Sequence, residues 1–232
     1  MNNLTLLHGS DHIIEIPDIN IGNEHNDYGR GFYCTHLEEM AKEWACKQNT
    51  DGFVNKYELD TEGLKILDLT DGNHTVLNWI ALLLQNRTFK LGSEVSVEAR
   101  DYLIEHYLVD LENIDIIIGY RADDSYFQYA EGFVNGGLPL RLLNKALLLG
   151  KLGKQTVLVS QKAFDRIKFI SASPVSKDVY YPKFIDRDSS ARNTFKNEIK
   201  KGKLAKDDIF VFDILREEMA NDDPRIQRII SE

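Results

Sequence analysis

Residues 27–35 read DYGRGFYCT, in which two glycines flank an arginine directly before an aromatic pair. Glycines let a backbone approach a ligand closely, and the amides of such a loop can bind phosphate groups. The GxxxxGK[ST] pattern of a phosphate-binding loop is absent, and a GxGxxG loop would need a third glycine and a preceding strand. The stretch therefore predicts either a turn with a positive φ angle or a loop that contacts a ligand.

Other polar and aromatic positions have residue types that suit the same kind of site. His8 follows a short apolar run and precedes Gly9 and Ser10, so these residues are expected at the end of a first strand. Gln155 stands at the entry of a late predicted strand. Trp44 falls on the helix expected after the glycine loop, eleven residues beyond its tyrosine. These residues and the glycine loop are candidates for a single site.

Four segments together resemble the ADP-ribosyltransferase superfamily, in its diphtheria-toxin and poly(ADP-ribose)-polymerase-like branch. They are LHGS, DYGRGFYCTHLEEMAKEWA, DIIIGYRADD and KQTVLVSQKAF. The branch carries a histidine on its first strand, usually as H-G-S/T, a tyrosine in a G-x-G-x-Y segment, and an acidic or amide residue opening a later strand. An uncharacterised bacterial group in this superfamily shares all four segments, and the resemblance covers residues 4 to about 170.

The resemblance implies a site for the nicotinamide half of NAD. The Gly9 backbone would pair with the carboxamide, with Ser10 assisting, because a backbone edge offers a donor and an acceptor side by side. His8 would hold a ribose hydroxyl. Tyr33 would stack on the nicotinamide ring and Trp44 would form a second aromatic wall, since a flat cationic ring favours aromatic faces.

The same resemblance implies how charge would be handled. Arg30 would form a bidentate contact with the pyrophosphate, and Gly31 would let the backbone pass close to the dinucleotide. Gln155 stands where the family most often has glutamate, and an amide can orient a ribose hydroxyl but carries no full negative charge. Transfer of single ADP-ribose units is therefore favoured over polymer growth. Asp123 and Asp124 are our candidates for the missing charge.

Each candidate residue also has a purely structural interpretation. His8 could be a core histidine bonded to backbone, and Trp44 could simply pack on an apolar helix face. Gln155 could do no more than begin its strand. Asp123 and Asp124 could cap the helix that follows them, because aspartate is a favoured N-cap.

Composition limits the classes of function. The 232 residues carry a net charge of −9, which argues against a broad electrostatic grip on nucleic acid. Cys34 and Cys46 show neither a disulfide framework nor zinc-ligand spacing, and no metal site is expected. The start of the chain lacks a signal-peptide pattern, and no apolar run is long enough for a membrane span, so we expect a cytoplasmic protein.

The elements predict an α+β fold, specifically an ADP-ribosyltransferase-like split antiparallel β-sandwich with an NAD cleft and peripheral helices. Residues 53–59 and 64–69 read as a strand pair joined by a tight turn. Thr35 and Glu38 fit a capping box at a helix start. We expect a catalytic domain over residues 1–175 and a helical extension with two helices over residues 176–232.

The function that these observations predict is mono-ADP-ribosyl transfer. The enzyme would cleave NAD, as a substrate, and pass ADP-ribose to a macromolecular acceptor, a protein or a nucleic acid. Such enzymes in bacteria are often toxins or defence effectors, which suggests a neutralising antitoxin as a partner. Two alternatives stay open: hydrolysis of NAD with water as the acceptor, and a catalytically inactive NAD-binding or interaction module.

Overall fold

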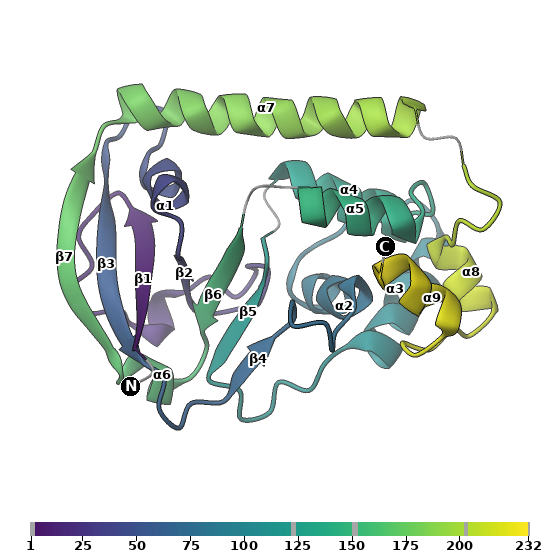
Figure 1. Ribbon diagram of the computed structural model, residues 1–232, viewed down its shortest axis with the longest axis horizontal. Coiled ribbons are helices and arrows are strands. Elements are labelled where there is room, and N and C mark those ends of the chain that lie inside the picture. The colour runs from purple at the N-terminus through teal and green to yellow at the C-terminus, as the bar shows by residue number, and fades with distance from the viewer. Residues whose placement is uncertain (1–2, 122–123, 150–152, 202–203, 232) are drawn as a thin grey trace. The chain divides into compact units, whose positions relative to one another are not determined.

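The protein is represented by a computed structural model that describes residues 3–121, 124–149, 153–201 and 204–231 (Figure 1). It divides into two compact units built from interleaved segments. Unit 1 comprises Met1–Asp68, Leu111–Arg121 and Leu152–Arg187, and unit 2 comprises Leu69–Asp110, Ala122–Lys151 and Asp188–Glu232. The expected domain boundary at residue 175 falls between a strand and a helix, but the units themselves are not contiguous in sequence.

Unit 1 contains one mixed sheet of seven strands in the order β4-β5-β6-β2-β1-β3-β7. The strands are β1 (Asn3–Ser10), β2 (Phe32–Thr35), β3 (Gly52–Asp60), β4 (Ile66–Asp68), β5 (Ile116–Tyr120), β6 (Lys154–Leu158) and β7 (Ile167–Val175). All neighbouring strands are antiparallel except β4 and β5, which are parallel. The α+β class is therefore confirmed, and the sheet is mixed where an antiparallel one was expected.

The parallel pair follows from the connection between its strands. The chain leaves β4, forms two helices and only then enters β5, and a parallel pair needs such a long crossover. The predicted hairpin between residues 53–59 and 64–69 is wrong for a related reason. β3 is already paired on both edges, with β1 and β7, so it has no free edge for β4.

The helices of unit 1 are α1 (Glu38–Ala45), α6 (Gln161–Phe164) and the first turns of α7 (Lys177–Lys201), and a short 3-10 helix covers Ile19–Ile21. α1 starts where the sequence predicted, but the capping box is absent: Leu37 is the N-cap residue and makes no side-chain cap bond. α1 lies directly on the sheet, because a Cβ on Gly9 or Gly52 would clash with the helix backbone at Ala45.

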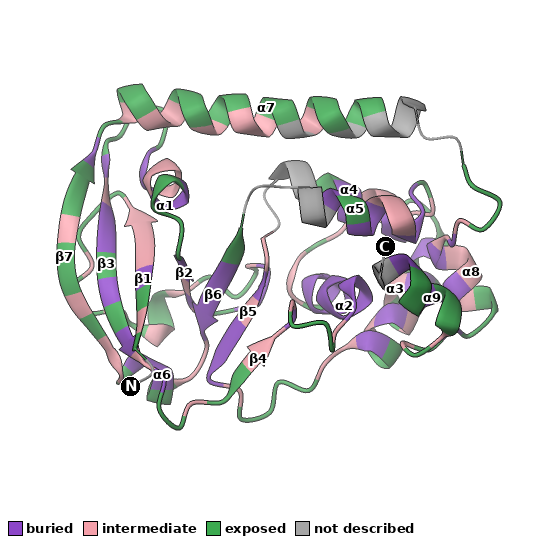
Figure 2. Ribbon diagram, viewed as in Figure 1, coloured by how far each residue is buried: buried purple, intermediate pink, exposed green. Residues whose placement is uncertain are grey.

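Side chains of the sheet alternate between two faces. We call the face that carries Leu7, Tyr33, Thr35 and Gln155 the α1 face, because Leu7 packs there against α1. The opposite face holds the larger core of unit 1. Its buried members include Leu6, Phe32, Cys34, Tyr57, Leu59, Ile116 and Leu158. The buried strands of this core are visible in Figure 2.

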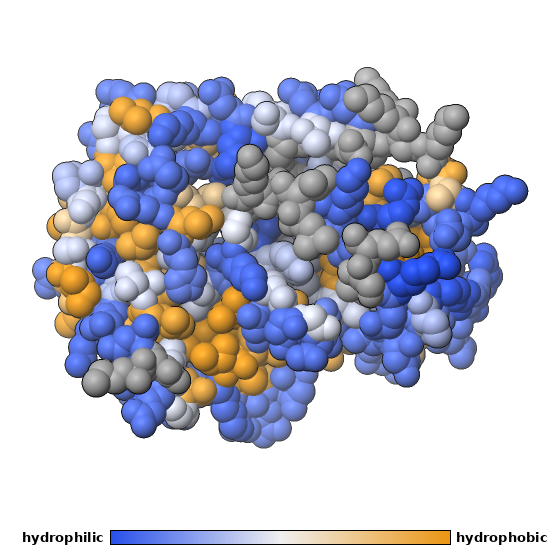
Figure 3. Space-filling model, viewed as in Figure 1, coloured by the Kyte–Doolittle hydropathy of each residue, from blue (hydrophilic) through white to orange (hydrophobic). Residues whose placement is uncertain are grey.

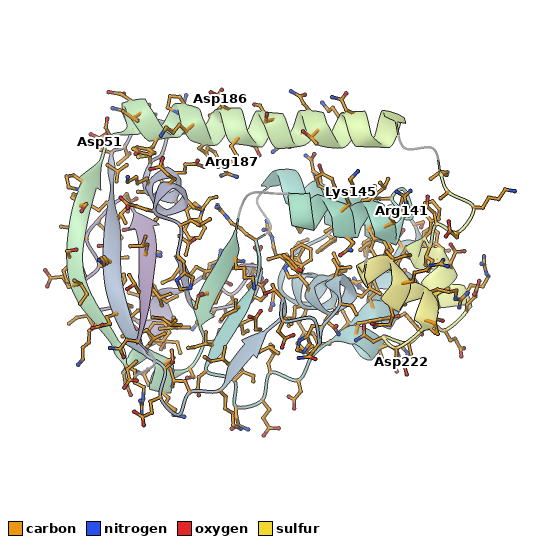
Figure 4. All side chains as sticks on the ribbon, viewed as in Figure 1. Asp51, Arg141, Lys145, Asp186, Arg187 and Asp222 are labelled. Carbon is orange, nitrogen blue, oxygen red and sulfur yellow. The ribbon has the colours of Figure 1, made fainter. Side chains whose placement is uncertain are left out.

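α7 runs unbroken through Pro182, whereas the sequence predicted a tail with only two helices. Its start is held by a bond from the Lys177 amide to the Asp51 carboxylate at 2.8 Å, and both Asp51 and Arg187 are labelled in Figure 4. Arg187 pairs with Glu43 of α1 at 2.6 Å, with both side chains largely buried. These contacts hold α7 on both sides of Pro182, where the proline removes one helical hydrogen bond.

Unit 2 is helical and centres on α2 (Val76–Asn86), in which every residue from Val76 to Leu84 is buried (Figure 2). The other helices are α3 (Glu94–Tyr107), α4 (Asp124–Val134), α5 (Leu140–Leu149), the end of α7, α8 (Val211–Arg216) and α9 (Pro224–Ser231). Arg141, labelled in Figure 4, forms a two-bond ion pair with the buried carboxylate of Asp208. The C-terminal segment thus contributes to the core of unit 2.

Candidate active site

Tyr33 and Gln155 project from neighbouring strands on the α1 face of the sheet. In the ladder, Thr35 lies opposite Gln155, and Tyr33 lies two residues before Thr35 on the same face. On its other side Gln155 pairs with Gly119 of β5. The two predicted site residues on β2 and β6 therefore do converge.

The Gln155 side chain is buried, with 3% of its surface exposed, and its amide nitrogen is fully used. Nε2 donates to the carboxylate Oδ2 of Asp27 at 3.2 Å and to the carbonyl oxygen of Tyr120 at 3.1 Å. An amide has two hydrogens, so both are committed. Only Oε1 of Gln155 is left to contact a ligand.

The segment Asp27-Tyr28-Gly29 folds back over β5, β6 and β2. The Tyr28 hydroxyl donates to the Tyr120 carbonyl at 2.6 Å, and it fits because Gly119 has no Cβ to overlap it. The Tyr33 hydroxyl donates to the Gly29 carbonyl at 2.7 Å and accepts from the Tyr28 amide at 3.0 Å. The hydroxyl of Tyr33 thus fixes the glycine turn.

The two glycines of the GRG stretch serve different needs. Gly29 has a φ of 74°, so the predicted positive-φ turn is confirmed. A Cβ on Gly31 would lie 2.7 Å from the Leu158 carbonyl oxygen, so Gly31 allows close contact with β6. Between them, Arg30 is exposed and pairs with Glu24. The turn interpretation accounts for both glycines without a ligand.

A chain of contacts connects Trp44 of α1 with Gln155 on the α1 face of the sheet. The guanidinium carbon of Arg121 lies 4.2 Å from the centre of the Trp44 ring, and its Nη1 contacts the Met40 sulfur. Arg121 directly follows Tyr120, whose carbonyl binds Gln155. The Trp44 Nε1 is buried and has no hydrogen-bond partner among the described residues. A buried indole donor is normally hydrogen-bonded, so the Trp44 Nε1 is an exception.

His8 lies on the opposite face of the sheet from Tyr33 and Gln155. Its ring stacks on Phe32, with centroids 4.5 Å apart, and its Nδ1 lies 2.7 Å from the Tyr33 carbonyl oxygen. A carbonyl can only accept, so Nδ1 carries the hydrogen. Burial lowers the pKa of His8, and the bond to the Tyr33 carbonyl opposes this only in part. His8 thus bridges β1 and β2 as a neutral imidazole, and its side chain does not join the other candidates.

The ladder between β1 and β2 is short at this point. These strands share one register pair, Leu7 with Thr35, whereas His8 to Ser10 pair only with β3. Gly9 lies against α1, and the Ser10 hydroxyl donates to the His12 carbonyl and accepts from Asn55 at 3.3 Å. The ends of β1 and β2 therefore separate beside His8, although Ser10 is already engaged in a turn.

Two residues of this cluster were missed from the sequence, and two predicted ones cannot be placed. Asp27 and Arg121 lie at the centre of the contacts just described. Asp27 opens the DYG segment, but an acid in a polar loop carries no signal of burial. Asp123 lies outside the described residues. Asp124 begins α4, and its side chain also lies outside the described part of the chain.

A second buried carboxylate, Asp115, lies just before the other end of β5 and accepts hydrogen bonds from neighbouring segments. The Ser160 hydroxyl donates to it at 2.6 Å, the Lys65 amide donates at 2.8 Å, and the Lys162 ammonium lies at 3.4 Å. Burial by itself would raise the pKa of Asp115, but these donors outweigh it and the pKa is lowered. All of its contacts are internal, so this carboxylate has a structural role.

Some site types have no counterpart among the described residues. Within residues 3–121, 124–149, 153–201 and 204–231, no three His, Cys, Asp or Glu side chains gather as metal ligands would. In the same ranges, no helix combines the length and the apolar character needed to cross a bilayer. In the view of Figure 3, the apolar residues on the surface gather mainly over the strands of unit 1.

Comparison with known proteins places the cluster inside a family region. The chain belongs to the DUF3990 family, described as a protein of unknown function, and the family model matches residues 4–169. That span contains His8, Asp27, Tyr33, Trp44 and Gln155. No curated protein and no solved structure matches the chain.

Proposed function

We propose that this protein is a mono-ADP-ribosyltransferase that cleaves NAD and transfers ADP-ribose to a macromolecular acceptor. The observation that carries the proposal is that Tyr33 and Gln155 share one face of the sheet and that Gln155 is hydrogen-bonded to the buried carboxylate of Asp27. Trp44 stacks on Arg121, the residue after the Tyr120 carbonyl that Gln155 also binds. An aromatic ring attracts a cationic pyridine ring, and a buried carboxylate stabilises the positive charge that forms as a glycosidic bond breaks.

The proposal includes the finer fold assignment. The separation of β1 from β2 beyond Leu7 and Thr35 would correspond to the NAD cleft of the ADP-ribosyltransferase fold. A strand end that pairs with a neighbour on one side has unpaired backbone N–H and C=O groups on its other side. These groups could form hydrogen bonds with a carboxamide. In this arrangement His8 acts from the opposite face of the sheet and sets the spacing of the two strands by its bond to the Tyr33 carbonyl.

The reaction would proceed by cleavage of the bond between the ribose C1′ and the nicotinamide nitrogen. The electron pair leaves with nicotinamide, and positive charge develops on C1′ and the ring oxygen. The acceptor then forms a bond to C1′ and loses its proton to solvent. Tyr33 would stack on the pyridine ring, and Gln155 Oε1 would orient a ribose hydroxyl. Arg30 would exchange Glu24 for the pyrophosphate.

The test is incubation of the purified chain with NAD labelled in the ADP-ribose half, with and without cell lysate. Label on protein or nucleic acid, with release of nicotinamide, is the expected result. Release of free ADP-ribose instead would identify NAD hydrolysis. Absence of both, with NAD still bound in calorimetry, would identify an inactive binding module.

A pair of variants at one residue tests whether NAD occupies the proposed site. Tyr33→Ala removes the ring and should weaken NAD binding by about 1–3 kcal/mol. Tyr33→Phe keeps the ring and should retain most of the affinity, although it loosens the glycine turn. Equal affinities of the wild type and Tyr33→Ala in calorimetry would remove Tyr33 from the site.

A further inference from the structure

The orientation of the Gln155 amide is fixed by its surroundings. Its Nε2 faces the Tyr120 carbonyl at 3.1 Å and the Asp27 carboxylate at 3.2 Å, and each of these groups accepts hydrogen bonds. An amide turned over by 180° would bring Oε1 against both acceptors. Gln155 therefore presents Oε1 away from Asp27, in the direction left for a ligand.

Asp27 differs from the other acids of its loop in being buried. Its exposed fraction is 7%, whereas Asp18 and Glu24 are exposed. Burying a carboxylate is costly unless it is hydrogen-bonded, and the Gln155 amide provides one such bond. A charge shielded from water also acts strongly on its neighbours, because the effective dielectric constant is low.

We propose that Asp27 carries the negative charge that Gln155 lacks, and that it acts through the Gln155 amide as a positioning residue. This inference rests on the proposed NAD-cleaving function. The charge on Asp27 polarises the amide, so Oε1 becomes a stronger acceptor for the ribose hydroxyl. The field of the same charge stabilises the cation that forms as nicotinamide leaves with the electron pair. Asp27 forms no bond to the substrate and gives up no proton.

The pairing also explains why position 155 holds an amide. A carboxylate there would face Asp27 at 3.2 Å, and two like charges at that distance oppose each other. The site would thus hold its carboxylate on the loop and its amide on β6.

The first test is Asp27→Asn, which removes the charge and keeps an oxygen that can accept from Gln155. We expect kcat for nicotinamide release to fall at least about 100-fold, the scale of losing an electrostatic stabiliser, with KM changed less than about threefold. Asp18→Asn is the matched control, because this exposed loop acid caps the Ile19–Ile21 helix and should leave kcat unchanged. Thermal melting shows whether each variant folds.

The second test moves the charge instead of deleting it. The double variant Asp27→Asn with Gln155→Glu places the carboxylate on β6 and the amide on the loop. It should recover at least about tenfold in kcat over Asp27→Asn alone. A folded Asp27→Asn variant with wild-type kcat, or a double variant no faster than the single one, would overturn the inference while leaving the proposed function standing. A wild-type chain that releases no nicotinamide would overturn both.

Discussion

Gln155→Glu is the substitution whose effect the structure determines most directly. In the folded chain the amide nitrogen lies 3.2 Å from the Asp27 carboxylate, and the two residues are 3% and 7% exposed. The variant replaces this donor by a carboxyl group of nearly the same shape. The variant therefore places two carboxyl groups, those of Asp27 and of the glutamate at position 155, next to each other in a buried place where water screens their charges little.

The magnitude follows from the distance. Two unit charges 3.2 Å apart at an effective dielectric constant of about 20 repel each other by about 5 kcal/mol. The folded state avoids this by keeping the introduced carboxyl protonated, so its pKa is raised above the unfolded value of about 4.3. The penalty is absent below about pH 4 and grows by about 1.4 kcal/mol for each pH unit above it, until it reaches about 5 kcal/mol.

The assay is thermal unfolding of the wild type and Gln155→Glu at several pH values. Between pH 5 and pH 8 the penalty should rise by about 4 kcal/mol, which corresponds to about 8–16 °C in Tm for a chain of this size. A loss of about 1–2 kcal/mol that does not vary with pH is also expected, because the Tyr120 carbonyl loses a donor.

The matched control is the double variant Asp27→Asn with Gln155→Glu, which keeps the new carboxyl and removes the facing charge. Its Tm should lose most of the pH-dependent penalty seen in Gln155→Glu. A Gln155→Glu variant with the same loss of Tm at pH 5 and at pH 8 would show that Asp27 and Gln155 do not face each other. The description of the site would then be wrong at its centre.

Three further predictions concern the framework of unit 1. The folded-state pKa of Asp115 is lowered, so the carboxylate contributes stability above the unfolded-state pKa of about 4, and this contribution is lost as the pH falls through the folded-state pKa. Asp115→Asn should remove this contribution, which unfolding measured across an acid pH series would show. Gly31→Ala should destabilise the fold by about 1–3 kcal/mol in urea unfolding, because its Cβ would press on the Leu158 carbonyl; unchanged stability would contradict the close contact. Burial lowers the pKa of His8, so the wild type should lose stability as the pH falls below about 6.5, the unfolded value. His8→Gln should not show this loss, and parallel plots of unfolding free energy against pH for the two proteins would contradict the burial of His8 as a neutral ring.

Local sequence patterns predicted the elements better than their pairing. The continuous apolar run at β5 indicates a strand and the helical periodicity at α2 indicates a helix, and both elements are present. The partner of a strand, however, depends on which other edges are free. β3 pairs with β1 and β7, which are distant in sequence, so the short turn between β3 and β4 was misleading. α7 likewise continues through Pro182, and Lys183 and Arg187 beyond the proline form ion pairs with acids of α1.

The candidate site shows the same limit at the level of single residues. Motif spacing brought Tyr33 and Gln155 together correctly, since both fall on strands that become neighbours. It also grouped His8 with them, but strand parity puts the His8 ring on the other face, against Phe32. Spacing along the chain does not encode which face a side chain takes until the register is known.

The glycine turn links the stability of this site to its chemistry. The Tyr33 hydroxyl holds the turn, the turn carries Asp27, and Asp27 aims the Gln155 amide. Tyr28 belongs to the same hydrogen-bond network, because its hydroxyl donates to the Tyr120 carbonyl that also accepts from Gln155. A perturbation at any of these residues therefore reaches Oε1 of Gln155 through hydrogen bonds alone. Gly29 therefore matters to the proposed mechanism without touching a ligand, because its positive φ forms the turn that follows Asp27 and is held by Tyr33.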